Sequence, residues 1–192
     1  MEALDEKAEK KISKDFKISY YICCFAVISI IGWIFEITEE FVRGRGFTNR
    51  GFLYGSYLPI YGMGAILIYF VLNRLMKKRI KIWKINSTPI IIFMAVLIIT
   101  SVFEYVSSWS LEMIFNQRWW DYSYEKFNLN GRIFLKNIIL ISIAGTVFLY
   151  GLEPLIKRLI SKVNTKVLNY IAILITVIIS IDLIITLIGH WK

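Results

Sequence analysis

Four carboxylates lie inside, or at the end of, stretches that are otherwise apolar: Glu36, Glu104, Glu112 and Asp182. A charged carboxylate at the centre of a bilayer costs about 2.5–3.5 kcal/mol even on lenient insertion scales, so such residues are usually paired or face a polar cavity. Three chemistries fit this pattern: ion pairs that join helices, a binding site for a cation or polar solute, and a catalytic acid or base. The carboxylates alone leave all three open.

One of these stretches carries a polar stripe. Glu104, Ser108 and Glu112 follow i, i+4, i+8 spacing, and an angular drift of about 80° over eight residues keeps them on one helix face. Arg50 and Arg132 each precede the next apolar stretch, so hairpin geometry predicts that Glu36 approaches Arg50 and Glu104 approaches Arg132. The candidate substrate-binding residues are therefore Glu36, Arg50, Glu104, Ser108, Glu112, Asp121, Arg132 and Asp182.

Other chemistry is sparse in the sequence. Asp121, in the run Trp120-Asp121-Tyr122-Ser123, is either a proton-transfer group or a turn-forming aspartate. His190 is the sole histidine and has no second ligand nearby in sequence, and the adjacent Cys23 and Cys24 have no metal-binding spacing. We expect no metal, no cofactor and no catalytic residue. The chain also lacks a phosphate-binding loop, which excludes ATP hydrolysis by that mechanism.

The elements that must position these residues are five apolar spans. They are expected near 18–38, 57–73, 88–112, 133–152 and 167–189, and each is long enough to cross the hydrocarbon core of a bilayer as a helix. The runs are continuously apolar, which favours a helix bundle over a membrane barrel. Residues 1–17 are expected to form a cytoplasmic arm, and residues 18–192 a single transmembrane domain.

The positive charges sort by side. Most of the 23 Lys and Arg lie in the N-terminal arm and in the connections at 74–84 and 157–166. The positive-inside rule therefore predicts a cytoplasmic N-terminus and an extracytoplasmic C-terminus. The net charge of +9 is explained by these flanks facing anionic headgroups, so nucleic acid is not an expected partner.

The sequence also contains an internal repeat. Phe35-Glu36 and the later Asn49-Arg50-Gly51 match Phe103-Glu104 and the later Asn130-Gly131-Arg132. Each set predicts a helix, an outer loop and a returning helix, with both hairpins in the same orientation. The predicted fold is an all-α integral membrane protein: a bundle of five transmembrane helices, made of two parallel-repeat helical hairpins plus a fifth helix.

Several longer motifs resemble a known bacterial family. They are Gly32-Trp33-Ile34-Phe35-Glu36, Asn49-Arg50-Gly51-Phe52-Leu53-Tyr54-Gly55, Pro59-Ile60-Tyr61-Gly62, Glu104-Tyr105, Trp120-Asp121-Tyr122-Ser123 and Phe127-Asn128-Leu129-Asn130-Gly131-Arg132. The family is that of multi-pass proteins named as ABC-transporter permeases, "type IV". The resemblance covers about residues 20–150 and implies a plasma-membrane subunit that works with a separate ATPase.

The function that we expect is that of a permease subunit with an acidic, outward-facing cavity for a cation or polar solute. Two alternatives stay open: a membrane enzyme acting on a lipid-linked envelope substrate, and a structural or regulatory bundle. An enzyme is the less favoured reading, because no activated nucleophile or metal set is visible. The expected partners are the lipid bilayer and a separate ATPase subunit, with a homo-oligomer left open.

Overall fold

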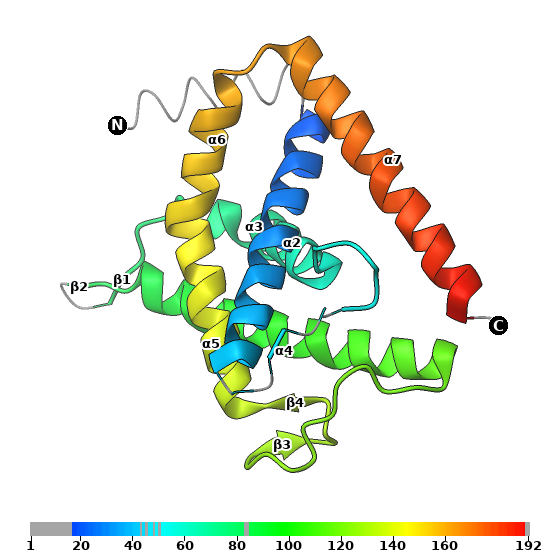
Figure 1. Cartoon of the computed structure of the whole chain (residues 1–192). Coiled ribbons are helices and arrows are strands. Elements are labelled where there is room, and N and C mark those ends of the chain that lie inside the picture. Colours follow the sequence, from blue (N-terminus) through cyan, green and yellow to red (C-terminus); the bar gives the residue numbers. More distant parts are fainter. Residues whose placement is uncertain are drawn as a thin grey trace. The chain divides into compact units, whose positions relative to one another are not determined.

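The computed structural model describes residues 17–42, 44, 46–47, 49, 51–82 and 85–190. Within them, five helical segments are long and apolar enough to cross a membrane, which confirms the all-α, five-span prediction (Figure 1). They are α2 (Lys17–Val42), α3 (Pro59–Met76), α4 (Thr88–Phe115), the run of α5 (Leu135–Val147), η1 (Phe148–Leu152) and α6 (Glu153–Ser161), and α7 (Thr165–His190).

The strands in the described residues are short. β1 (Lys81–Ile82) pairs antiparallel with β2 (Ile85–Asn86) in the connection between α3 and α4. β3 (Asn128–Leu129) pairs antiparallel with β4 (Ile133–Phe134) in the loop between α4 and α5. Both two-stranded ladders lie in connections between helices.

Several helices extend beyond the apolar spans that were predicted from the sequence. α4 continues to Phe115, where Asn116 takes a left-handed conformation (φ 52°) and its N–H bonds the carbonyl of Glu112. The fourth span continues from a π-helical turn into the amphipathic α6. Pro154 has no N–H to donate to the preceding turn, which accounts for the wider turn just before it.

The chain divides into two compact units, and each is described by itself. Unit 1 comprises residues 1–66 and 151–192, and unit 2 comprises residues 67–150. The single transmembrane domain over residues 18–192 and the parallel repeat of two hairpins stay predictions from the sequence.

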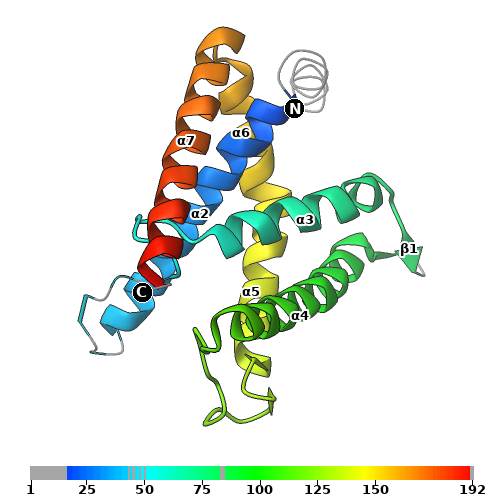
Figure 2. The same cartoon turned by 90° about the vertical axis from the view of Figure 1, so that its right-hand side faces the viewer.

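In unit 1, α2 lies between α6 and α7 (Figure 1). α2 and α7 begin at the same end of unit 1 (Figure 2). At that end the hydroxyl of Ser19 donates to Oδ1 of Asn169 at 2.6 Å. The start of α3 crosses α2 closely, because Gly62 leaves no side chain between itself and Ser29. A Cβ at Gly62 would lie 2.4 Å from that hydroxyl oxygen and 2.6 Å from the backbone oxygen of Phe25.

In unit 2, α4 and α5 form an antiparallel hairpin. The buried residues of α4 recur at every fourth position: Thr88, Ile92, Val96, Thr100, Glu104 and Ser108. Gly145 of α5 lies against Val96, where a Cβ would come within 2.9 Å of the valine side chain. The line of contact between α4 and α5, called the seam below, is thus apolar near Val96 and polar from Thr100 onward.

Candidate functional site

The polar part of the α4–α5 seam gathers four predicted site residues in unit 2. The Nδ2 amide of Asn137 donates to Oε1 of Glu104 at 3.1 Å, and the guanidinium of Arg132 donates to the hydroxyl of Ser108 at 3.3 Å. Nη2 of Arg132 lies 2.5 Å from Oε2 of Glu112. Glu104, Ser108 and Arg132 are all buried, at 8%, 5% and 9% exposure. The seam therefore contains a largely buried network of charged and polar side chains.

The loop that carries Arg132 is built to hold it in place. The indole N–H of Trp120 donates to the Arg132 carbonyl at 3.0 Å, and the guanidinium carbon lies 5.7 Å from the centre of the Tyr105 ring. Gly131 has a φ of +69°, and a Cβ there would meet the side chains of Ser123 and Asp121. A glycine is required at this turn for conformational and steric reasons.

Glu112 connects this buried network to the exposed loop. Its Oε1 accepts a hydrogen bond from Nε of Arg118 at 3.0 Å, so Glu112 is shared between Arg118 and Arg132. The hydrogen bond and charge of Glu112 raise the pKa of Arg118. Two guanidinium groups on one carboxylate make a bridge between the helix end and the loop.

Asp121 acts within its own loop. Its Oδ1 accepts hydrogen bonds from the backbone N–H of Ser123 at 2.9 Å and from the Ser123 hydroxyl at 2.6 Å. These bonds, the hydroxyl first, lower the pKa of Asp121 despite some desolvation. A carboxylate that bonds the residue two positions on is a turn former, and this geometry favours the turn-forming reading over proton transfer.

Asp182, in unit 1, accepts several hydrogen bonds. Its two oxygens accept the backbone N–H groups of Tyr54 (3.1 Å) and Gly55 (2.9 Å), and the phenol of Tyr57 (2.5 Å). A longer contact of 3.4 Å comes from Thr186 on the same helix. Asp182 therefore fastens the loop before α3 to α7, across more than a hundred residues of sequence.

Glu36, also in unit 1, has a neutral partner from α3. The phenol of Tyr61 donates to Oε1 of Glu36 at 2.6 Å. The Tyr61 ring also packs against Gly32, which lies one turn before Glu36 on α2. Arg50, the partner predicted for Glu36, lies outside the described residues.

The structure divides the predicted site residues between the two units. Glu104, Ser108, Glu112, Asp121 and Arg132 come together in unit 2, whereas Glu36 and Asp182 belong to unit 1. The predicted pairing of Arg132 with Glu104 differs from the structure, where Arg132 pairs with Glu112 two helical turns further on. Arg132 lies in the loop before α5, where the indole of Trp120 holds its backbone carbonyl. This position places the Arg132 side chain near the end of α4. Over the described residues, no group of three or more His, Cys, Asp or Glu side chains is arranged to hold a metal ion.

Sequence reasoning missed one buried carboxylate and its partners. Oε1 of Glu153 accepts the Tyr20 phenol at 2.7 Å and lies 2.8 Å from Nζ of Lys157. Glu153 is 4% exposed. The available signal was the spacing of Glu153 and Lys157 at i, i+4 directly after an apolar span, which is typical of a helical ion pair.

Five apolar helices that bury paired charges define an integral membrane protein of the helical class. A family model described as "Putative ABC-transporter type IV" matches residues 23–187, so the chain belongs to that family. This confirms the family suggested by the loop motifs. No curated protein and no solved structure matches the chain.

Tyr57 yields a pH-dependent prediction. Burial, together with the hydrogen bond to Asp182, raises its pKa above the usual range of a phenol. We expect Tyr57→Phe to lower the free energy of unfolding in detergent by about 1.5 kcal/mol at pH 7 to 9, since a hydrogen bond to a charged acceptor is lost. Above about pH 10 an unfolded tyrosine releases its proton while folded Tyr57 retains it. The wild-type advantage must therefore shrink as the pH rises.

The control for Tyr57→Phe is Tyr170→Phe, at a position where the side chain is 73% exposed. This variant should follow the wild type at every pH. A wild-type advantage over Tyr57→Phe that stays constant up to pH 11 would contradict the assignment.

The shared carboxylate Glu112 yields a second prediction. In double-mutant cycles on thermal unfolding, the pair Glu112→Gln and Arg132→Gln should show strong non-additivity, because removing Glu112 leaves the buried guanidinium of Arg132 without its ion pair. The matched control cycle pairs Glu112→Gln with Arg118→Gln. Arg118 is 36% exposed against 11% for Arg132, so the control coupling should be smaller. Equal coupling in both cycles would count against the burial of Arg132 as the source of the strong coupling.

Proposed function

We propose that this chain is the membrane-spanning permease subunit of a transport system and that a separate ATPase subunit energises it. Family membership and the five apolar helices support a membrane transport protein. The sequence carries no phosphate-binding loop of its own, which supports a division of labour between two chains.

The observation that carries the proposal is the polar seam of unit 2. The buried face of the apolar helix α4 contains Thr100, Glu104 and Ser108. Leucine or alanine at these positions would pack the helices without the free-energy cost of burying polar groups. Ionisable groups inside transmembrane segments commonly mark the path of an ion or polar solute. We assign the solute site to this seam.

The chemistry of the seam indicates the kind of solute. Glu104 contributes a buried carboxylate, and its Oε1 accepts the side-chain amide of Asn137 at 3.1 Å. Ser108 adds a hydroxyl oxygen next to it on the same face. A carboxylate and a hydroxyl on one buried helix face suit a cation or a cationic polar solute. The Arg132–Glu112–Arg118 bridge would then close the end of the site toward the loop.

Other predicted site residues receive different roles in this proposal. Asp182 has four donors and serves to anchor the loop, not to bind solute. Glu36 is held by the neutral Tyr61 and remains a second candidate ligand in unit 1.

A purely structural bundle is the second candidate function. It is favoured by the partners that the structure gives to Glu36, Glu104, Glu112 and Asp182. In that case the charges would only join helices, and no solute flux would depend on them.

Glu104→Gln distinguishes the two candidates. The substitution keeps an oxygen that accepts the Asn137 amide but removes the charge. We expect ATP-dependent uptake of at least one labelled probe among rubidium, manganese and choline into membrane vesicles from cells that naturally produce the chain. Replacing the wild-type copy with Glu104→Gln should reduce this uptake about tenfold, equivalent to ~1.4 kcal/mol of binding.

The matched control for the flux experiment is Glu125→Gln, a carboxylate of the loop between α4 and α5 that lies outside the seam. Its uptake should equal that of the wild type. Equal uptake in all three forms, with equal amounts of folded protein, would eliminate the seam as the solute site.

We also propose that the chain resides in a bacterial plasma membrane with its N-terminus in the cytoplasm. A cysteine at Glu125 should react with a membrane-impermeant maleimide added to intact cells, whereas one at Lys162 should react only after permeabilisation. The native Cys23 and Cys24 are buried and should give little background. If Lys162→Cys were labelled in intact cells and Glu125→Cys were protected, the orientation would be opposite to the one proposed.

A further inference from the structure

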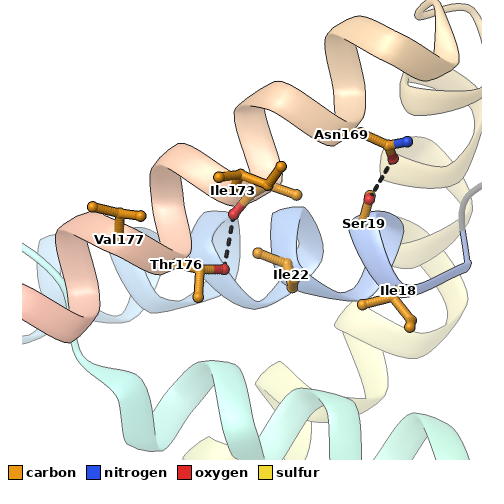
Figure 3. A pocket seen from close by; sticks show the side chains of 8 residues that line it. Ile18, Ser19, Ile22, Asn169, Ile173, Thr176 and Val177 are labelled. Atoms are coloured by element: carbon orange, nitrogen blue, oxygen red, sulfur yellow. Dashed lines mark hydrogen bonds between the residues drawn. The ribbon is translucent and has the colours of Figure 1, made fainter.

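The two helices of unit 1 that begin at the same end leave a groove between them. The groove measures about 390 Å³ and runs between α2 and α7 (Figure 3). Its walls are mainly branched aliphatic side chains, among them Ile22, Ile173 and Val177. Thr176 contributes little polarity, because its hydroxyl bonds the carbonyl of Ala172 on its own helix at 2.8 Å.

One end of the groove is polar. Ser19 and Asn169 meet there through the 2.6 Å hydrogen bond, close to the starts of both helices. This bond uses Oδ1 of Asn169, and Figure 3 shows the amide nitrogen turned away from Ser19. That nitrogen can donate to a further oxygen at the mouth of the groove.

The same end carries positive charge. Lys162 and Lys166 are exposed at the turn between α6 and α7. Lys166 precedes Asn169 by three residues and Ile173 by seven, so helical periodicity puts it on the stripe of α7 that lines the groove. α7 also starts here, with Asn164 accepting the N–H of Lys166 at 2.9 Å, and the start of a long helix favours an anion.

We propose that this groove binds an anionic phospholipid. One acyl chain lies along Ile22, Ile173 and Val177, and the ester region meets Asn169. The phosphate lies at Lys162, Lys166 and the start of α7. The rise from Asn169 to Val177 is about 12 Å, which gives an acyl chain a continuous apolar track.

Charge complementarity selects this occupant over an apolar helix from another protein, which would leave the lysine pair unmatched. The predicted topology places this end at the cytoplasmic leaflet, where anionic lipids are enriched. The site lies within unit 1 and does not depend on the transport proposal.

The test uses the full chain in a neutral detergent, with thermal unfolding and native mass spectrometry as readouts. Phosphatidylglycerol should raise the unfolding temperature and remain bound, and phosphatidylcholine should do so less. In the Lys162→Gln, Lys166→Gln double variant the apparent affinity for phosphatidylglycerol should fall about tenfold. Ile173→Trp should abolish retention by filling the groove.

Two controls make the result specific. Lys126→Gln removes an exposed lysine of unit 2, and Ile171→Trp places the same bulk about 200° around α7. Both should behave as the wild type. Glycerol phosphate, added alone, should not stabilise the protein. The proposal is overturned if the lysine variant keeps the full lipid preference, if Ile173→Trp and Ile171→Trp retain lipid equally, or if glycerol phosphate reproduces the effect.

Discussion

A charged side chain that this chain places inside an apolar span needs a partner within the protein, because the hydrocarbon around the span offers none. The rest of the structure follows from this constraint. Asp182 on α7 takes two backbone N–H groups and a phenol from the loop before α3. Glu153 takes Tyr20 and Lys157, and Glu104 takes Asn137. Each of these three carboxylates thereby ties together segments that are distant in sequence.

The connections between the helices supply many of these partners. The loop before α3 delivers backbone donors to Asp182, and the loop before α5 delivers Arg132 to Glu112. Both loops turn at a glycine with positive φ, Gly51 at +105° and Gly131 at +69°. A side chain at either position would be strained, so these glycines set the geometry that brings the donors within reach. The loops are thus part of the packing of each unit as well as its connections.

Partner and position separate carboxylates with different uses. Glu112 and Glu153 are matched by cations, which neutralise them and fix helix ends. Oε1 of Glu36 accepts the Tyr61 phenol, and Oε1 of Glu104 accepts the Asn137 amide. Glu104 also lies on the buried face of α4 within the contact with α5, whereas Glu112 lies near the end of α4 and joins it to the loop. This difference in position is why the solute site is proposed at Glu104 and not at Glu112.

The sequence by itself determined the class of protein, the five spans and the family. Continuous apolar runs permit only helices in a membrane, and the i, i+4 spacing of Glu104, Ser108 and Glu112 already placed them on one face. The limits of the helices were less predictable, because Asn116 and Pro154 act through backbone geometry and not through apolarity. Only the tertiary structure decided the partners: Arg132 took Glu112 in place of Glu104, and Asp182 took a loop more than a hundred residues away. Pairing of that kind depends on the packing and register of whole helices, which no local pattern of residues encodes.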